Sequence, residues 1–169
     1  IGNEVLDAMA SEVMRWTENG IEQMGVSIVD DQFAWTQRPV SDERILAEAL
    51  RIQPDKQPYT SELHLNQTAF IATLAQKLVR GAIIMIDYGF DEAQYYHPQR
   101  SMGTLIGHYR HHVVDDPFFW PGLMDLTCHV NFTAMAQAAV DNDLDLIGYT
   151  SQAHFLFNLG ITEVLLAEH

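Results

Sequence analysis

Ala82-Ile83-Ile84-Met85-Ile86-Asp87-Tyr88-Gly89-Phe90 is the stretch of sequence that decides the fold class. Its five leading residues are all apolar and follow a segment with helical periodicity, which is typical of a strand in a parallel sheet covered on both faces. Open α/β sheets bind ligands at the carboxyl ends of their strands. The sequence therefore predicts an α/β fold, with Asp87 and Tyr88 near a site and Gly89 allowing a tight turn.

The segment before this strand has the pattern of an amphipathic helix that Asn66 begins and Gly81 ends. Its predicted apolar face consists of Phe70, Ile71, Leu74, Leu78 and Val79. Residues 59–65 are predicted to be extended. Residues 53–58, which contain two prolines, are predicted to form a loop.

Residues 12–40 alternate between apolar and polar side chains, which predicts a three-stranded antiparallel meander. Gly20, Gly25 and the pair Asp30-Asp31 interrupt the alternation and mark its turns. A helix with Ser41 as its N-cap is expected to follow the meander.

The second half of the chain is predicted to mix loops with short elements. Residues 91–103 and 115–125 are expected to be loops, and residues 104–114 a strand or part of one. A helix is predicted to start at Asn131 or Thr133 and to run through Val140. A strand is expected over 144–150, and a helix over 152–159 that ends at Gly160.

The composition favours one globular domain and excludes several classes of partner. The chain has 169 residues, 47% of them hydrophobic, which is enough for a sizeable core. Its net charge of −14 argues against binding to nucleic acid or to an anionic membrane, and it would attract a basic partner. Cys128 is the single cysteine, so it forms no intrachain disulfide and is read as a small buried hydrophobe. No apolar run approaches the ~20 residues of a membrane span.

Four groups of short motifs follow one another along the chain. They are Asn3-Glu4-Val5-Leu6-Asp7-Ala8; Tyr59-x-Ser61-Glu62; Ile86-Asp87-Tyr88-Gly89 with Tyr95-Tyr96-His97-Pro98; and a last group of Gly103-Thr104-Leu105, Tyr109-x-x-His112, Asp116-Pro117, Pro121-Gly122 and Asp125-Leu126-Thr127-x-His129-Val130-x-Phe132. Each motif is weak alone. Together they cover nearly the whole chain, which resembles the MidA family of S-adenosylmethionine (SAM) methyltransferases.

This resemblance implies a partial Rossmann-like class I methyltransferase fold that binds SAM at the carboxyl ends of its strands. Residues 1–169 would be the C-terminal portion of the methyltransferase domain, with 12–40 as an antiparallel β-meander insertion and 59–169 as the remainder of the sheet and helices. The family's glycine-rich cofactor loop has no counterpart in this sequence, so that loop is expected upstream of Ile1.

The resemblance also implies a protein substrate, because the family includes a mitochondrial protein that methylates an arginine of a respiratory complex I subunit. The expected partner is a basic or arginine-bearing protein, with a homodimer as a further candidate assembly. The expected location is the cytoplasm in a bacterium or the mitochondrial matrix in a eukaryote. The alternative is a non-catalytic fragment that binds a partner or assists assembly, which the missing glycine loop favours.

Methyl transfer from a sulfonium mainly requires alignment of donor and acceptor, and carboxylates can hold a guanidinium through paired hydrogen bonds. Glu4 is the candidate acceptor clamp, and Asn3 and Glu4 are the candidate cofactor-binding residues that would line the edge of the SAM pocket. A charge at the start of a helix is the equally weighted alternative for Glu4. Asp7 could share the face of Glu4, but a helix-start role is favoured for it.

Three further residues complete the expected acceptor side. Glu62 is either a second site carboxylate or the ion-pair partner of Arg100 or Arg110, with equal weight. Asp87 is predicted to be a site carboxylate rather than only a turn former. Tyr88 would stack on the substrate or form a hydrogen bond with it.

The histidines are predicted to serve a pocket rather than a metal. His108, His111 and His112 are close in sequence, but neighbours on an extended segment point to opposite faces, and the chain has no His-Glu-x-x-His motif. His112 and His129 are expected to line the substrate pocket, with a structural, hydrogen-bonded histidine as the alternative. The aromatic groups Tyr95-Tyr96 and Phe118-Phe119-Trp120 would line a groove or cover a core or dimer contact.

Overall fold

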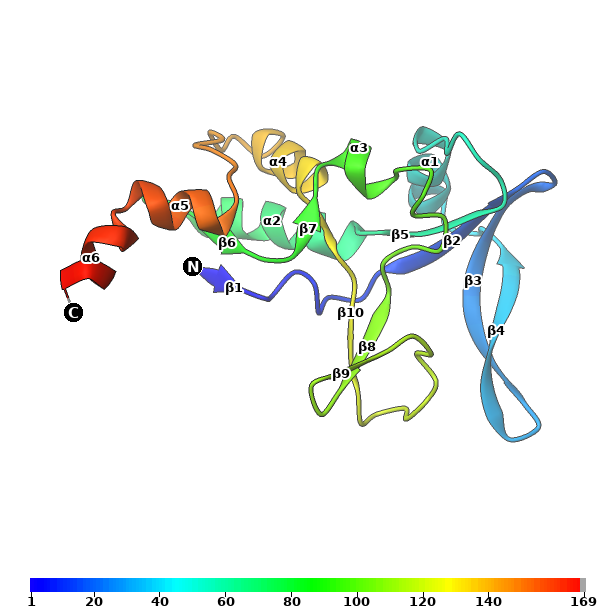
Figure 1. Ribbon diagram of the computed structural model, residues 1–169. Coiled ribbons are helices and arrows are strands. Elements are labelled where there is room, and N and C mark those ends of the chain that lie inside the picture. The colour runs from blue at the N-terminus through cyan, green and yellow to red at the C-terminus, as the bar shows by residue number, and fades with distance from the viewer. Residues whose placement is uncertain (168–169) are drawn as a thin grey trace.

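The computed structural model describes residues 1–167 and has a mixed α/β architecture (Figure 1). Its strands are β1 (Gly2–Asn3), β2 (Glu12–Thr17), β3 (Gly20–Val29), β4 (Gln32–Pro39), β5 (Tyr59–Leu63), β6 (Met85–Ile86), β7 (Gly89–Phe90), β8 (Ile106–Tyr109), β9 (His112–Val114), β10 (Asp125–Thr127) and β11 (Val130–Asn131). Its helices are α1 (Glu43–Arg51), α2 (Leu65–Lys77), α3 (Glu92–Tyr95), α4 (Phe132–Val140), α5 (Gln152–Asn158) and α6 (Ile161–Ala167). The predicted α/β class is confirmed, although these residues form several small sheets rather than one large one.

The meander predicted over residues 12–40 is present as β2, β3 and β4, which pair antiparallel in sequence order. Strand β5 pairs antiparallel with β2, so the sheet has the order β4-β3-β2-β5. Residues 59–63 therefore belong to the same sheet as the meander, and the boundary drawn between them in the sequence does not separate two sheets.

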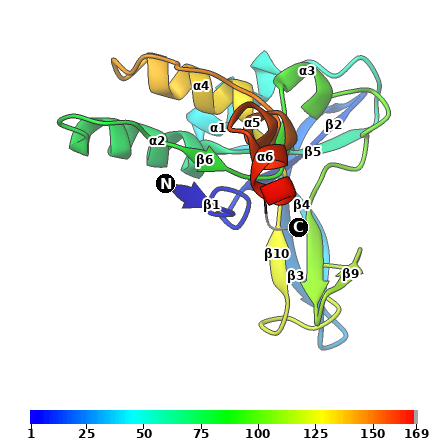
Figure 2. The ribbon, with the colours of Figure 1, turned by 60° about the vertical axis from the view of Figure 1, so that its left-hand side comes forward.

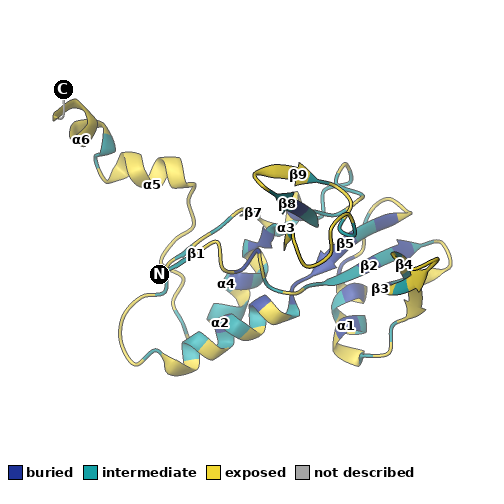
Figure 3. Ribbon diagram, turned by 90° about the horizontal axis from the view of Figure 1, so that it is seen from below, coloured by how far each residue is buried: buried dark blue, intermediate teal, exposed yellow. Residues whose placement is uncertain are grey.

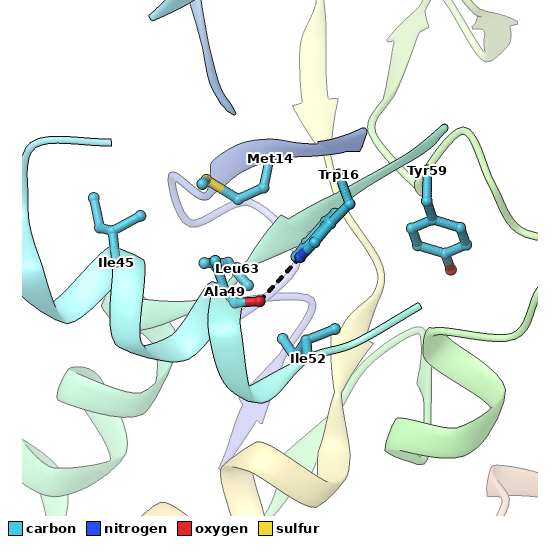
Figure 4. Close-up of a cluster of buried hydrophobic side chains, with 7 residues drawn as sticks. All are labelled: Met14, Trp16, Ile45, Ala49, Ile52, Tyr59 and Leu63. Carbon is cyan, nitrogen blue, oxygen red and sulfur yellow. Dashed lines mark hydrogen bonds between the residues drawn. The ribbon is translucent and has the colours of Figure 1, made fainter. Parts of the chain in front are cut away.

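The main core lies between this sheet and α1 (Figure 4). Its members are Met14, Trp16, Ile45, Ala49, Ile52, Tyr59 and Leu63. The indole Nε1 of Trp16 donates a hydrogen bond to the carbonyl oxygen of Ala49 at 2.9 Å, as the dashed line in Figure 4 marks. This bond satisfies the polar group of a buried aromatic side chain and fixes α1 against β2.

Two short parallel pairs lie on the other side of the molecule, next to α2 and α4. Strand β1 pairs with β6, and β7 pairs with β11. A second core of Leu6, Ile71, Val130 and Met135 joins these strands to the two helices. The prediction of parallel pairing is confirmed, and it brings the first residues of the chain beside residues 85–86.

The strand predicted over residues 82–86 is shorter than expected, because only Met85 and Ile86 pair with a neighbour. Ile84 and Ile86 are 42% and 36% exposed, so the expected burial on both faces is wrong for the part of the chain that the structure describes. Gly89 has no positive φ and does not serve a tight turn. A Cβ at Gly89 would lie 2.8 Å from the carbonyl carbon of Val130, so the glycine permits close approach of β7 and β11.

Residues 104–114 form the β8–β9 hairpin instead of a single strand, because Arg110 and His111 adopt positive φ and reverse the chain. Strand β10 pairs with the other edge of β8, giving the order β10-β8-β9. This small sheet and the β3–β4 hairpin extend in the same direction from the rest of the molecule (Figure 2). The ring of Phe118, in the loop that precedes β10, contacts the β3–β4 hairpin.

Several predicted helix boundaries need correction. Asp42, not Ser41, caps α1, because its carboxylate accepts a hydrogen bond from the Arg44 amide at 2.8 Å. His64, not Asn66, stands at the N-cap of α2, and the helix ends at Lys77, before Gly81. The predicted start of α4 is confirmed, since the Asn131 side chain caps it.

Two segments differ in kind from the prediction. Residues 91–103 contain the short helix α3, which the Asp91 carboxylate caps through the Gln94 amide. Residues 144–150 do not form the predicted strand, because no strand of residues 1–167 pairs with them and most of their side chains are exposed.

The C-terminal helices α5 and α6 extend away from both cores (Figure 3). The helix predicted over residues 152–159 is confirmed as α5, but neither α5 nor α6 has a buried residue. None of the helices in residues 1–167 has the length and apolar character that a bilayer crossing requires.

Candidate functional site

The carboxyl ends of β1 and β6 bring together two carboxylates that are far apart in sequence. The parallel register places Asn3 beside Ile86, so Glu4 and Asp87 follow directly at the same edge. The Glu4 amide donates to the Ile86 carbonyl oxygen at 2.9 Å, which continues the ladder by one residue. Glu4 and Asp87, which the sequence indicated separately as candidate site carboxylates, therefore lie at the same edge.

Asp87 holds the turn that follows β1. Its Oδ2 accepts hydrogen bonds from the backbone amides of Val5, Leu6 and Asp7 at 3.1, 2.9 and 3.3 Å. Its Oδ1 accepts from the Tyr88 amide at 2.9 Å. Both oxygens thus bind backbone donors, which gives Asp87 a positioning role, while the direct catalytic role stays a prediction.

Asp7 is the buried carboxylate of this turn, with a residue exposure of 8%. Its Oδ1 is buried and has no hydrogen-bond partner within residues 1–167. Burial raises the pKa of Asp7, and the negative charges of Asp87 and Glu4 raise it further. The turn therefore contains a buried acceptor atom close to the negative charges of Asp87 and Glu4, and a nearby cation would stabilise this group.

Glu4 and Tyr88 form the exposed side of the same edge. Glu4 has a φ of 48°, an uncommon conformation for a residue other than glycine, and one that often occurs at functional sites. Tyr88 is 61% exposed, and its pKa is raised, chiefly by the negative charge of Glu4. An aromatic ring beside a carboxylate is a combination that can hold a guanidinium group.

Two side chains of α2 and one backbone amide also hold the turn over residues 4–10 in place. Buried Gln67 on α2 donates its side-chain amide to the Leu6 carbonyl oxygen at 2.7 Å. Asn66 donates to the Ala10 carbonyl oxygen at 2.8 Å, which explains why its side chain does not cap α2. The Cys128 amide donates to the Asp7 carbonyl oxygen at 2.9 Å, and Cys128 is buried as predicted. These contacts give the carboxylates a rigid support.

His129 lies half-buried on a neighbouring part of this edge. Its ring stacks on Phe90 with centroids 5.1 Å apart, and the Arg100 guanidinium lies 4.1 Å from the centroid of the Phe90 ring. Burial and the positive charge of Arg100 lower the pKa of His129, so the imidazole is neutral at pH 7. The predicted pocket role of His129 is compatible with this position and stays a prediction.

Glu62 is fully buried and belongs to a different network. Its carboxylate accepts from the Tyr95 hydroxyl at 2.8 Å and from the Thr104 and Leu105 amides at 2.9 and 3.0 Å. No arginine within residues 1–167 forms a salt bridge with it, so the predicted pairing with Arg100 or Arg110 is wrong. Backbone and hydroxyl donors stabilise this carboxylate in place of a cation.

Thr104 connects Glu62 with His129. Its hydroxyl donates to Glu62 Oε2 at 3.1 Å and accepts from the His129 amide at 3.0 Å. The Val130 amide then donates to the Tyr88 carbonyl oxygen at 2.7 Å. Glu62 therefore supports the candidate site through the backbone, and its direct catalytic role stays a prediction.

His112 lies apart from these residues, exposed on the edge strand β9 of the small sheet. No contact of the described residues joins it to Glu4, Asp87 or Tyr88, so the structure gives no support to its predicted pocket role. Within residues 1–167, no three His, Cys, Asp or Glu side chains gather in a way that could hold a metal ion.

Two residues at this edge, Asp7 and Gln67, were not predicted from the sequence as site residues. Asp7 was read as a helix start, although its spacing of three from Glu4 signalled a shared face. Gln67 was not singled out, because a polar side chain within an amphipathic helix resembles many exposed ones. The buried carboxylate of Asp7, close to the charges of Asp87 and Glu4, would favour a cation at this edge.

The chain is similar in sequence to known methyltransferases. Residues 1–150 match the family described as "Putative S-adenosyl-L-methionine-dependent methyltransferase". The whole chain is 30% identical to the zebrafish (Danio rerio) mitochondrial protein arginine methyltransferase NDUFAF7, over 178 residues that make up 39% of that protein. The methyltransferase resemblance seen in the sequence motifs is thereby confirmed.

Two crystal structures from Burkholderia thailandensis have the same fold. One, described as a "likely methyl transferase" bound to S-adenosyl-homocysteine, is 46% identical and superposes with a TM-score of 0.91 over 98% of this chain and 43% of its own. The other, a native structure of an uncharacterized protein, is 46% identical with a TM-score of 0.92 over 98% of this chain and 44% of its own. The chain thus spans less than half the length of these relatives.

SAM carries positive charge on its sulfonium sulfur and on its amino group. The Asp7 carboxylate is compatible with such charges, and the exposed Glu4 carboxylate is compatible with a guanidinium. The residues present therefore fit the charged part of the cofactor that the family description names.

Proposed function

Because the chain belongs to the family of putative S-adenosyl-L-methionine-dependent methyltransferases, we propose that the intact protein transfers a methyl group from SAM to an arginine side chain of a protein. One observation carries this proposal: Glu4, Asp7 and Tyr88 lie around the carboxyl ends of β1 and β6, where the buried Asp7 Oδ1 has no hydrogen-bond partner among the described residues. The arginine acceptor is supported by the zebrafish relative, which is a protein arginine methyltransferase.

The proposed chemistry requires the chain to align an acceptor and to take up its charge. When bound, SAM supplies an electrophilic methyl group on a sulfonium sulfur. A C–N bond would form while the C–S bond breaks, S-adenosyl-homocysteine would leave, and the proton lost by the guanidinium nitrogen would pass to the Glu4 carboxylate. Glu4 would hold the guanidinium through paired hydrogen bonds and would orient the nitrogen lone pair. Tyr88 would cover the planar face of the guanidinium.

The finer fold assignment is part of the same proposal. We place the pairs β1–β6 and β7–β11 in one Rossmann-like class I parallel sheet, of which residues 1–169 are the C-terminal portion and 12–40 an insertion. The last residues, 168–169, lie outside the described part of the chain. The location would be the cytoplasm in a bacterium or the mitochondrial matrix in a eukaryote, as for the mitochondrial relative.

The experiment that tests this function follows the methyl group. The intact protein is incubated with SAM carrying a labelled methyl group and with a peptide library that contains arginine, and fragmentation mass spectrometry locates the label. Label on a guanidinium nitrogen is the expected result. A matched library with lysine in place of arginine is the control, because lysine keeps the charge but cannot bind in the bidentate way. Equal labelling of the lysine library, or label on other side chains only, would contradict the arginine acceptor.

A further inference from the structure

The β3–β4 hairpin has an apolar face that no other helix or strand of residues 1–167 covers, although the loop residue Phe118 packs against part of it. Val26 lies opposite Trp35 and Ile28 opposite Phe33 in the antiparallel register, so all four side chains point to one side. They are 53%, 40%, 70% and 48% exposed, respectively. Four large apolar side chains in two adjacent cross-strand pairs form a continuous exposed surface.

Apart from Val29 beside the turn, the opposite side of the same hairpin has small or polar side chains. Ser27 pairs with Ala34, and Gly25 pairs with Thr36. An antiparallel sheet with one solvated face normally turns its apolar face to the core. This hairpin turns its apolar face to solvent, and exposed apolar patches of this kind mark interaction sites.

A neighbouring loop extends the apolar surface. The ring of Phe118 lies 5.0 Å from that of Trp35 and 6.3 Å from that of Phe33, measured between centroids. Phe119 and Trp120 stack on each other at 5.6 Å and are 52% and 43% exposed. We refer to the surface formed by Val26, Ile28, Phe33, Trp35 and Phe118 as the docking face.

Carboxylates border the docking face at two places. Asp30 and Asp31 form the turn of the hairpin, and Asp115 and Asp116 precede Phe118; all four are exposed. Arg110 brings a positive charge to the adjoining β8–β9 turn, where its guanidinium lies 5.4 Å from the Tyr109 ring. The border of the face is therefore predominantly acidic, in a chain whose net charge is −14.

We propose that the docking face binds a protein segment in which large apolar side chains alternate with arginine or lysine. Apolar side chains would cover Phe33 and Trp35, while basic side chains would meet the carboxylates at the border. A second copy of this chain is a poorer occupant, because it would bring the same carboxylates together in one interface. This proposal does not depend on methyl transfer, since the docking face shares no residue with the Glu4 site.

The test uses the intact protein and fluorescent probe peptides of about twelve residues, with the binding measured by anisotropy. One probe alternates leucine and arginine, a second replaces arginine with glutamate, and a third replaces leucine with serine. The leucine–arginine probe is expected to bind at least about tenfold more tightly than either of the others, because only it matches both the apolar face and its acidic border.

Two sets of variants locate the binding. The double variant Phe33→Thr with Trp35→Thr keeps residues suited to strands and is expected to weaken the leucine–arginine probe at least about tenfold. Thr36→Ser, on the opposite side of the hairpin, is the matched control and should leave binding unchanged. Asp30→Asn with Asp31→Asn should weaken binding and reduce its dependence on salt, and asparagine tolerates the positive φ of both positions. Circular dichroism and the melting temperature establish that each variant is folded.

Three results would overturn the proposal. The first is equal binding by the folded threonine double variant and the wild type. The second is a dimer of the intact protein, seen by sedimentation, that the double variant abolishes, since this would make a second copy the occupant. The third is protection of Trp35 from acrylamide quenching in the intact protein without a probe, since the docking face would then be covered already.

Discussion

At the scale of single residues, Asp7 distinguishes this strand end from an ordinary turn. Asp87 uses both of its oxygens to hold backbone amides, whereas Asp7 keeps one oxygen unpartnered while buried near two other carboxylates. Such an arrangement is unfavourable in the absence of a cation, because the charged form of Asp7 is poorly solvated and repelled. In the proposed site, Asp7 would therefore lower the stability of the free protein and favour the binding of a cation.

Asp7→Asn is predicted to stabilise the protein at pH 7 while weakening SAM binding or methyl transfer. The folded-state pKa of Asp7 is raised above its ordinary value of 3.8. Protonated Asp7 therefore favours the folded state below pH 3.8, and this stabilisation is lost as the pH rises through the folded-state pKa. The variant should therefore melt at a higher temperature than the wild type at pH 7. At pH 3, where Asp7 is protonated in both states, the difference should disappear.

The measurement is the melting temperature of both proteins between pH 3 and pH 8. Asp145→Ala, at an exposed position in an irregular segment, is the control for a general effect of lowering the negative charge. A lower melting temperature of Asp7→Asn at pH 7 would show that Asp7 contributes to stability instead of function.

At the scale of elements, Glu62 shows how β5 supports the site from a distance. Its carboxylate fixes the backbone at Thr104 and Leu105, and Thr104 in turn fixes His129. Tyr95 donates its hydroxyl to the same carboxylate, and burial, followed by the charge of Glu62, raises the pKa of Tyr95, so the hydroxyl remains protonated. The network holds three separate segments together.

Glu62→Gln is predicted to lower the free energy of unfolding by about 2–4 kcal/mol, because the new amide group would face buried amide donors. Methyl transfer by the intact protein should persist at temperatures where the variant is folded, since Glu62 acts through the backbone. Urea unfolding and a single-temperature activity assay measure the two effects. Glu18→Gln, in the exposed β2–β3 turn, is the matched control. Full stability with lost activity would instead make Glu62 a catalytic residue.

His64 is predicted to make stability depend on pH between about 4 and 6.5. Its Nε2 lies 2.8 Å from the Tyr95 hydroxyl, and burial lowers its pKa from 6.5 to about 4. A depressed histidine pKa stabilises the fold above pH 6.5, and this contribution, about 3 kcal/mol at most, is lost as the pH falls towards 4. His64→Gln should remove this part of the pH dependence, whereas His112→Gln, at an exposed position, should retain it. Parallel profiles for His64→Gln and the wild type would refute the assignment.

The sequence predicted elements well where one local signal determined them. The alternation in residues 12–40 predicted the meander, and Asn131 predicted the start of α4, because pairing and capping are local effects. Residues 144–150 were predicted as a strand from their composition, but a strand also requires a neighbour for its backbone groups. The hydrogen-bond partners of Glu62 could not be predicted, since they are backbone amides of a loop, and every residue type except proline has such an amide.

At the scale of the whole molecule, the chain spans 43% of the Burkholderia structure that binds S-adenosyl-homocysteine. Within residues 1–167, the described strands provide two parallel pairs, and many apolar side chains of α5 and α6 are exposed. Motif order predicted the family correctly, because it does not depend on how much of a domain is present. The extent of the sheet could not be predicted in this way.

The 169-residue chain on its own is predicted to bind SAM at least about 100-fold more weakly than the intact protein, because its sequence has acidic acceptor groups but no counterpart of the family's glycine-rich cofactor loop. Isothermal calorimetry on both proteins measures the ratio. A folded chain, established by circular dichroism, is required for the comparison. Equal affinities would show that this chain contains the complete cofactor site.

The most direct test of the proposed site is methyl transfer by the intact protein with Glu4→Gln. We predict that kcat/KM for the arginine-bearing substrate falls by about 100-fold or more, as for the loss of a group that stabilises a transition state, while the Kd for SAM changes by less than about threefold. Glu18→Gln is the control and should leave both values unchanged. Retained turnover in Glu4→Gln would contradict the placement of the methyl-transfer site at the carboxyl ends of β1 and β6.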